Sequence, residues 1–527
     1  MPLELSVPSE RAAPPSSLEI RPKQAKAWIE ALPLSQSAEA ARKILASLGA
    51  MNRSKIVYDD RLQLLEIYRS IADVVLDELD AVYAKSQLPL SAKAKDALLL
   101  ARELTAEFAY GYKILILEKT GKLLGFGGKK HLPLLAYRAI GYLSSEIRTS
   151  YKSYTPVPAG AWREIHQLYL HAETEGVATE AQGADKKESI FDLYVESLLI
   201  ALTDPYRLTQ GELDKVVELI RSYRGTVTLG QAKVGTRPEA HFLVPIDRDK
   251  PPKPLLASSD EDAGGPNWRM LDANGIVDRL RSRKTAFETG NVSATSSRGM
   301  SPDALALLDK LVTLWGDPPK RAYRRDPMET NVAICAGIRA ITHYVAMEVQ
   351  IDPRQEAAAI QAGLTIPLIS LPDDEATTGL RVNEWEVVNQ SAGGLKVRRI
   401  GTTNQPITVG EAIGIKFMGR ARWCIGVVRW LTLLDDGGME FGIQFLAPAA
   451  RSVAVQPTIT GGAQVRSGLL LAEGDTFAGA DSILTPPNTY ADLREFEVED
   501  GGAVSCIRAT SLIEKTVRFE LFHFSPS

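Results

Sequence analysis

The feature that most constrains the fold of this chain is a change in the spacing of its apolar residues beyond the midpoint. Up to about residue 224, apolar residues recur every three or four positions, as in 61–85 and 92–119. This spacing predicts long amphipathic helices. From Asn331 onward, short runs such as 394–400 and 439–447 are rich in alternating apolar residues, which predicts antiparallel strands. We therefore expect a multi-domain α+β protein, helical first and β-rich later.

The N-terminal part contains further segments with helical spacing, separated by glycine and proline. We predict these helices at 131–151, 161–175, 188–202 and 211–223. Successive helices with short connections favour stacked antiparallel pairs. The segment 161–176 resembles a tetratricopeptide-type helix, but no clean repeat of about 34 residues is present. An all-helical bundle and a TPR-like solenoid therefore both fit residues 21–225.

The remaining boundaries follow from composition and spacing. At 527 residues, a chain with roughly 150 residues per domain should contain about three or four packed units. We expect the following parts: a flexible arm at 1–20, a connector at 226–300 with a strand-like run at 241–246 and a helix at 274–284, a β-barrel with a lead-in helix at 301–450, and a β-rich segment at 451–527. The last segment either extends the barrel or forms a second one.

Charge and cysteine content narrow the class of protein. The chain has 61 Lys and Arg against 65 Asp and Glu, so it lacks the broad basic field of a nucleic-acid binder, and an anionic ligand needs a local cluster. No apolar run has the roughly 18–20 residues of a membrane helix. Cys335, Cys424 and Cys506 lack metal-ligand spacing. We expect reduced thiols and a cytoplasmic location.

Two short motifs stand out because they occur in order around the first predicted strands. Arg321 to Arg325 form an R-x-x-x-R pattern just before the β-rich part, and Asn389 to Gly394 form N-x-S-x-x-G at a strand end. R-x-x-x-R alone is not specific, since it recurs at Arg279 and Arg283. The ordered pair, with the strands that follow it, resembles the signature of the PilZ family over about residues 320–446. PilZ domains are small β-barrels that bind cyclic di-GMP in bacteria.

The resemblance implies a PilZ-like antiparallel barrel with cyclic di-GMP as ligand and no cofactor. Guanidinium groups suit the guanine O6 and N7 atoms and the phosphates of this dinucleotide, because they are planar and always charged. Short polar side chains at a strand end suit a guanine edge, and glycine lets the backbone approach closely. The candidate ligand-binding residues are Arg321, Arg324, Arg325, Asn389, Ser391 and Gly394.

The sequence departs from the family pattern in the long segment between the two motifs. We interpret 337–380 as an insertion between the first two strands, with a helical-looking stretch at 352–363. Such an insertion either covers the site or completes it. Three clustered arginines are compatible with one or two bound dinucleotides.

No other motif supports metal binding or catalysis. The six histidines have no metal-binding spacing, and the run GFGGKK at 125–130 lacks the full phosphate-loop pattern. No nucleophile motif is present. Trp385, Trp423 and Trp430 lie in predicted strands, where barrel core is the usual place for them.

The sequence thus favours a non-enzymatic cyclic di-GMP receptor. In this hypothesis a C-terminal barrel binds the dinucleotide, and the helical domain binds an unidentified protein partner. The alternatives are a ligand-free PilZ-like scaffold that works through protein contacts and, less favoured by the charge balance, a single-stranded nucleic-acid binder.

Overall fold

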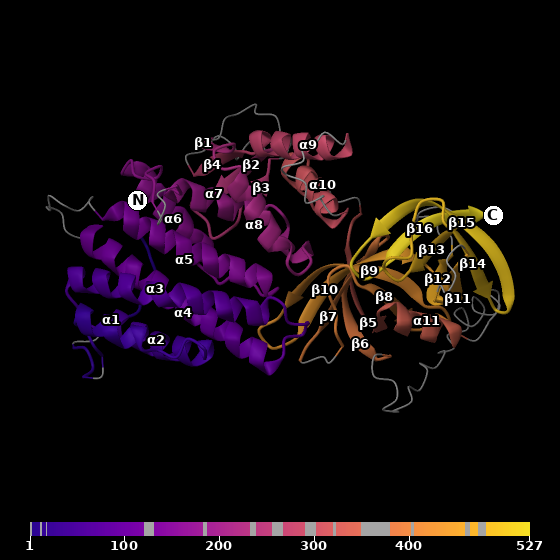
Figure 1. Ribbon diagram of the computed structural model, residues 1–527, viewed down its shortest axis with the longest axis horizontal. Helices are drawn as coiled ribbons and strands as arrows, with labels where there is room; N and C mark the ends of the chain where they lie inside the picture. The colour runs from indigo at the N-terminus through magenta and orange to yellow at the C-terminus, as the bar shows by residue number, and fades with distance from the viewer. Residues whose placement is uncertain are drawn as a thin grey trace. The chain divides into compact units, whose positions relative to one another are not determined.

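The chain divides into two compact units, with the boundary between Lys320 and Arg321. The structure is a computed structural model and describes residues 3–10, 13–16, 18–120, 131–182, 187–231, 239–255, 267–289, 302–319, 323–348, 380–401, 405–458, 464–472 and 481–527. Figure 1 shows helices in the first unit and β-barrels in the second. The expected multi-domain α+β architecture is confirmed.

The first unit opens with a series of helices, of which α3 to α8 follow the predicted segments closely. They are α1 (Pro22–Glu30), α2 (Ser37–Asn52), α3 (Tyr58–Tyr83), α4 (Ala92–Thr120), α5 (Leu132–Lys152), α6 (Ala161–Thr174), α7 (Ile190–Ala201), the 3-10 turn η1 (Pro205–Arg207) and α8 (Glu212–Ser222). Local sequence sets several ends. Ser189 and Asp192 cap α7 reciprocally. Gly160 precedes α6 with φ 90°, a conformation that favours glycine.

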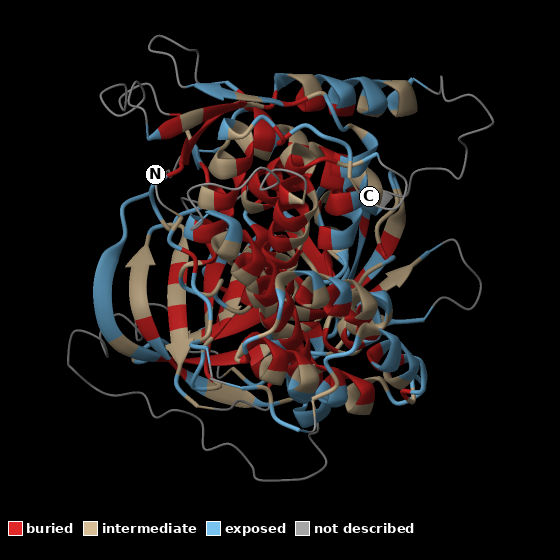
Figure 2. Cartoon of the chain, turned by 90° about the vertical axis from the view of Figure 1, so that its left-hand side faces the viewer, coloured by how far each residue is buried: buried red, intermediate tan, exposed pale blue. Residues whose placement is uncertain are grey.

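Helix α4 lies at the centre of this unit and packs against α2, α3 and α5, while α5 also contacts α6 and α7. The rings of Phe108 and Tyr142 stack 4.8 Å apart between α4 and α5. Figure 2 colours buried residues red and exposed residues pale blue, and helices in that view are red on one side and pale blue on the other. The apolar stripes that predicted the helices are therefore the surfaces that hold them together.

A buried ion pair and the N-terminal arm meet on α6. Lys113 Nζ lies 2.6 Å from Glu164 Oε2, and both side chains are buried. The other carboxylate oxygen of Glu164 accepts a hydrogen bond from the backbone N–H of Ser6 at 2.6 Å. The N–H of Glu4 donates to Gln167 Oε1 at 2.8 Å. Part of the segment predicted as a flexible arm is thus in contact with the helices.

The segment predicted as a connector contains a small antiparallel sheet of order β1-β4-β2-β3. Its elements are β1 (Thr228–Gln231), β2 (His241–Pro245), β3 (Lys253–Pro254), β4 (Trp268–Asp272) and helix α9 (Asn274–Glu288). Helix α10 (Pro302–Gly316) follows and contacts α9. The indole N–H of Trp315 donates to the carbonyl of Leu199 at 3.1 Å, which ties α10 to the end of α7.

The second unit begins with a closed antiparallel barrel of strand order β10-β7-β6-β5-β8-β9. Its strands are β5 (Asp326–Ala336), β6 (Val382–Ser391), β7 (Gly394–Arg399), β8 (Ala412–Phe417), β9 (Cys424–Leu433) and β10 (Met439–Ala447). Inside, the rings of Trp385 and Phe441 meet edge to face at 4.8 Å. Alternate residues of the strands face this core, as the sequence alternation predicts.

Residues 451–527 form most of a second closed barrel, which decides between the two alternatives left open by the sequence. Its order is β11-β12-β13-β16-β15-β14. The strands are β11 (Ala450–Pro457), β12 (Arg466–Leu471), β13 (Ser482–Thr485), β14 (Glu495–Asp500), β15 (Ala503–Lys515) and β16 (Glu520–Pro526). Stacked rings of Phe496 and Phe522, 5.8 Å apart, lie in its core.

Helix α11 (Ile338–Ala346) joins the two barrels. Its Ile341 and Tyr344 pack in one apolar cluster with Ile425 of the first barrel and with Leu469 and Leu484 of the second. The two barrels therefore share part of their core. Helix α11 lies in the predicted insertion at 337–380; the expected helical stretch at 352–363 lies outside the described residues.

No helix within the described ranges is both long enough and apolar enough to cross a lipid bilayer.

Candidate functional site

The N-x-S-x-x-G motif forms the tight turn between β6 and β7. Ser391 pairs with Gly394 at the end of the ladder, and the Ser391 hydroxyl donates to the carbonyl of Gly394 at 3.3 Å. A Cβ atom on Gly394 would lie 2.0 Å from the carbonyl oxygen of Ile443 on β10. The glycine is therefore needed because the backbone of the paired strand β10 lies too close for a side chain at this position.

The arginine loop runs directly into the strand beside this turn. Asp326 pairs with Gln390 and Pro327 with Asn389. A Cβ on Gly393 would lie 3.1 Å from the ring of Tyr323, so Tyr323 packs on the turn. The two motifs, far apart in sequence, thus form one surface at the same end of the barrel.

The structure describes two of the three loop arginines, and both are exposed. The side chain of Arg324 is 91% exposed, and its Nε lies 3.5 Å from Asp326 Oδ1. Arg325 is exposed as well. Arg321 lies outside the described residues. The described arginines thus project into solvent beside the turn, where they are accessible to an anion.

A β-bulge decides which way the polar residues of β6 point. The pairing of β6 with β7 shifts register between Val387 and Asn389. Val387 is buried in the barrel, and the bulge lets Asn389 pair with Lys396. Opposed residues in an antiparallel pair project from the same face of the sheet. Asn389 and Lys396 therefore share the outer face of the barrel.

This outer face continues across the next two strands. Lys396 pairs with Gly442 of β10, and Gly442 pairs with Trp430 of β9. A Cβ on Gly442 would lie 1.9 Å from Trp430 Nε1, so the indole lies over the glycine. We name the cross-strand series Asn389, Lys396, Gly442 and Trp430 the outer row.

The expectation that all three barrel tryptophans lie in the core is therefore wrong for Trp430. Trp385 and Trp423 are 1% and 3% exposed, whereas Trp430 is half-buried on the outer face. The sequence carried a signal for this arrangement, because a glycine inside a strand often marks a close approach by another group. Gly442 in the run EFGIQF is that glycine.

Charges next to the outer row are mostly paired. Lys396 Nζ lies 2.9 Å from Glu440 Oε2 and 5.9 Å from the centre of the Trp430 ring. Arg398 Nε lies 3.7 Å from Glu440 Oε1. Glu386 lies opposite Arg398 in the ladder of β6 and β7 and is exposed. Two carboxylates thus face these two cations, and the exposed arginines of the loop are the cations that remain for an anionic ligand.

The buried cysteine thiols and the buried histidine of the chain lie in surroundings that suit a structural role. Burial raises the pKa of the thiols of Cys335 and Cys424 to about 12 each, although Arg420 opposes this at Cys424, so neither is a thiolate at neutral pH. Burial lowers the pKa of His166 to about 4 against the opposing effect of its bond to the Lys250 carbonyl. Within the described ranges no group of His, Cys, Asp and Glu could hold a metal ion. The GFGGKK run lies outside the described residues.

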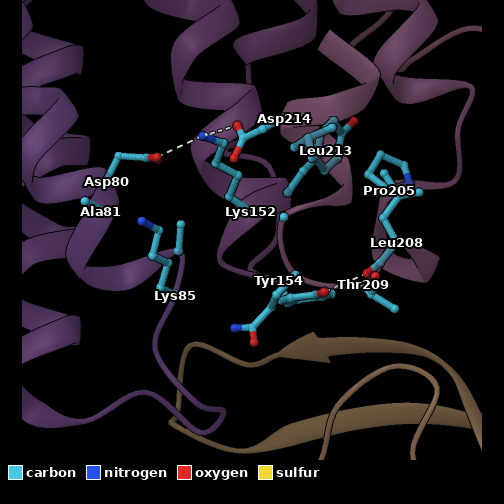
Figure 3. A pocket seen from close by; sticks show the side chains of 14 residues that line it. Asp80, Ala81, Lys85, Lys152, Tyr154, Pro205, Leu208, Thr209, Leu213 and Asp214 are labelled. Carbon is cyan, nitrogen blue, oxygen red and sulfur yellow. Dashed lines mark hydrogen bonds and ion pairs between the residues drawn. The ribbon is translucent and has the colours of Figure 1, made fainter. Parts of the chain in front are cut away.

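The helical unit contains a pocket of about 310 Å³ between the ends of α3, α5 and α8 (Figure 3). Lys152 Nζ bridges Asp80 Oδ2 at 2.9 Å and Asp214 Oδ1 at 2.7 Å along its wall. Burial would lower the pKa of Lys152, but the two carboxylates outweigh it and raise that pKa above its usual value. The cation is neutralised by these acids, so the pocket lacks the paired guanidinium groups that suit a dinucleotide.

Comparison with known proteins agrees with this geometry. Two family models match the chain: the N-terminal domain of the cyclic-di-GMP receptor FimW over residues 23–233, and the middle PilZ domain of the same receptor over residues 241–362 and 370–452. The resemblance to the PilZ family is thus confirmed for the part of the chain that contains both motifs.

Among individual proteins, the chain is similar to the cyclic-di-GMP receptor FimW of Pseudomonas aeruginosa. The two are 23% identical over 510 residues, which covers 86% of this chain and 82% of the relative. No solved structure matches the chain. Most of the second barrel, from residue 453 onward, lies beyond both family models.

Proposed function

We propose that this protein is a cyclic di-GMP receptor that binds the dinucleotide on the outer end of its first barrel and catalyses no reaction. The observation that carries the proposal is the convergence of the two motifs: Pro327 pairs with Asn389, and Tyr323 packs on Gly393. Similarity to a receptor of that name over most of the chain supports the choice of ligand.

Each motif has a role that its chemistry suits. Asn389 and Ser391 would present amide and hydroxyl groups to a guanine edge at the strand end. Arg321 and Arg325, with Arg324 beside them, would contact phosphates and the guanine O6 and N7 atoms. Gly394 would keep the turn close to β10. The loop arginines are exposed where they are described, so binding would draw them onto the turn.

The test is isothermal titration calorimetry of the full chain with cyclic di-GMP. We expect saturable binding that is lost in the Arg321→Ala/Arg325→Ala variant. The matched control is Arg279→Ala/Arg283→Ala, which removes the same R-x-x-x-R pattern from α9 in the first unit. GTP and cyclic di-AMP test selectivity. A folded wild-type chain that gives neither heat nor thermal stabilisation would leave the protein-binding scaffold as the function.

The helical unit is the part to which we assign a protein partner, because stacked helices offer extended surfaces for protein contacts. Ligand binding would act on this unit through the segment between α10 and β5, since the arginine loop follows α10 directly in the chain. Hydrogen exchange with and without the dinucleotide checks this coupling. Changed protection of α10 and the helices before it supports coupling, and changes confined to residues 321–527 contradict it.

We include a cytoplasmic location in the proposal. Cys335, Cys424 and Cys506 are free thiols in the structure, which suits a reducing compartment. Fractionation of cells that produce the protein at native level tests this assignment.

A further inference from the structure

Leu493 on the second barrel combines an exposed side chain with an unfavourable backbone conformation. The side chain is 64% exposed, and the backbone has φ 57°. This left-handed conformation suits glycine or asparagine and is unfavourable for leucine. Leu493 lies in a turn that is closed by the N–H of Arg494, which donates to the carbonyl of Ala491 at 3.1 Å. Neither burial nor turn geometry therefore accounts for a leucine at this position.

The loop that contains Leu493 is held in place by hydrogen bonds. Glu520 is 1% exposed, and its Oε2 accepts from the N–H groups of Thr489 and Tyr490 at 2.8 and 2.7 Å. Arg494 Nη1 donates to the carbonyl of Thr489 at 2.7 Å. The loop thus presents Leu493 in a fixed position, and a fixed loop loses little conformational freedom when it enters an interface.

Apolar side chains of β15 extend this exposed surface. The N–H of Ala509 donates to the carbonyl of Arg494 at 2.9 Å, and the Tyr490 hydroxyl lies near the backbone of Leu512. The loop therefore runs beside β15. A bulge at Ile513 interrupts the pairing of β15 with β16, and Leu512 and Ile513 are 40% and 37% exposed. We name the following residues the apolar patch: Leu493, Leu512 and Ile513. Exposed apolar groups that lie together are typical of protein contacts.

The charged residues on either side of Leu493 have opposite signs. Asp492 precedes it and Arg494 follows it, and neither forms an ion pair with any residue that the structure describes. The next two charges, Glu495 and Arg508, pair with each other at 2.5 Å. In an interface with two-fold symmetry each contact occurs twice. A patch with one free acid and one free base beside its centre can therefore pair both charges with those of an identical patch.

We infer that the apolar patch is an interface with a second copy of this chain, and that the two copies pack about a two-fold axis close to Leu493. In this dimer Asp492 of each copy faces Arg494 of the other. The patch is small, so the dimer is weak and depends on protein concentration. The inference goes beyond the proposed function and does not depend on the binding of cyclic di-GMP.

The first test is sedimentation velocity of the full chain at increasing concentration, without dinucleotide. Wild type should shift from monomer to dimer. Leu493→Asn removes the apolar side chain but suits the left-handed turn, so its thermal melting should not fall while its association weakens by roughly 30-fold or more. The control Val504→Thr changes another exposed valine of β15 and should associate as wild type does.

Charge reversal tests the two-fold arrangement. Asp492→Arg and Arg494→Asp each place like charges opposite one another, so each variant alone should remain monomeric. An equimolar mixture of the two pairs opposite charges at both contacts and should restore the dimer. Arg494→Asp also loses the bond to the carbonyl of Thr489; Leu493→Asn keeps the test decisive if that variant fails to fold.

Three results would overturn the inference: a wild-type chain that stays monomeric at every concentration, a dimer that Leu493→Asn leaves intact, or a mixture of the folded charge variants that remains monomeric. The receptor function is measured separately by titration with cyclic di-GMP. Its failure would leave the dimer unaffected, and failure of the dimer would leave the receptor function standing.

Discussion

Arg429 on β9 and Glu514 on β15 form a two-point ion pair between the barrels, with Nη1 to Oε1 at 2.5 Å and Nη2 to Oε2 at 2.8 Å. Arg429 is the residue at which β9 shifts register against β10, and it directly precedes Trp430. The outer row of the first barrel and its polar contact with the second barrel thus include two consecutive residues.

A double-mutant cycle should detect this pair. We expect Arg429→Ala and Glu514→Ala to be coupled by about 1 kcal/mol in the free energy of unfolding, because the pair is bidentate but part-exposed. Chemical denaturation monitored by near-UV circular dichroism measures it. The pair Arg508 and Glu495 within the second barrel is more exposed and should show weaker coupling. Equal coupling in the two pairs would contradict a special role for the inter-barrel contact.

Replacement of Gly394 should destabilise the first barrel. In Gly394→Ala the new Cβ meets the carbonyl of Ile443 at 2.0 Å, so β7 and β10 must separate. We expect a cost of about 2 kcal/mol or more, measured by thermal melting. Gly230→Ala in β1 is the matched control, because nothing lies within 4 Å of its added Cβ. Similar melting of both variants would show that the turn can relax.

The stability of the helical unit should fall with acid because of His166. Its Nε2 lies 3.0 Å from the carbonyl of Lys250 and its Nδ1 lies 2.6 Å from the hydroxyl of Tyr194. The ring therefore donates from Nε2 and accepts at Nδ1, which assigns the neutral tautomer. Asp247 and Asp249 oppose the effect of burial, but the pKa stays at about 4 against an ordinary value of 6.5.

The sign of this pH effect follows from proton uptake. Between pH 6.5 and 4 the unfolded chain protonates this histidine and the folded chain does not, so stability decreases as pH falls. The full loss is about 3 kcal/mol. His166→Gln should remove that slope in unfolding followed at 222 nm at pH 7 and pH 5. His171→Gln changes a half-buried histidine whose pKa is also lowered by burial, and it should reduce the slope of stability against pH by less. An unchanged slope in His166→Gln would contradict the assignment of this pH effect to His166.

Replacing one partner of the buried ion pair Lys113–Glu164 should lower the free energy of unfolding strongly. Replacing both partners should lower it less. Each single variant, Lys113→Met or Glu164→Gln, leaves an unpaired charge and should cost about 3–5 kcal/mol. The double variant should be more stable than either, since the amide of Gln can still accept from the N–H of Ser6. Lys43→Met, at an exposed pair with Glu39, is the control. Additive single effects in denaturant unfolding would refute the argument.

The sequence predicted most of the helices because their apolar faces repeat at helical spacing over many residues. The prediction of α4 as 92–119 differs from the observed helix by one residue at its end. The small sheet was largely missed: only β2 had a run of apolar residues, whereas β3 has two residues and β1 is mostly exposed. Such strands depend on pairing with distant segments, which local spacing does not reveal.

Only those residues of the candidate site that belong to a sequence motif could be predicted. The motifs identified Asn389 and the arginine loop, and strand pairing then showed that Pro327 and Asn389 are neighbours. The outer row has no motif, because its four residues come from four different strands, β6, β7, β10 and β9, and β7 and β10 are not consecutive in the chain. Its composition depends on bulges at Val388 and Arg429, and a one-residue bulge reverses which side chains face outward.

The cluster around α11 also limits how this protein can be divided. The match to the PilZ family model ends at residue 452, which lies inside β11. A fragment cut there would lose Leu469 and Leu484, and Ile341 and Tyr344 would be left facing water. The unit recognised in the sequence is therefore smaller than the unit that can close its own core. Any module transplanted into another protein has to carry both barrels and the helix between them.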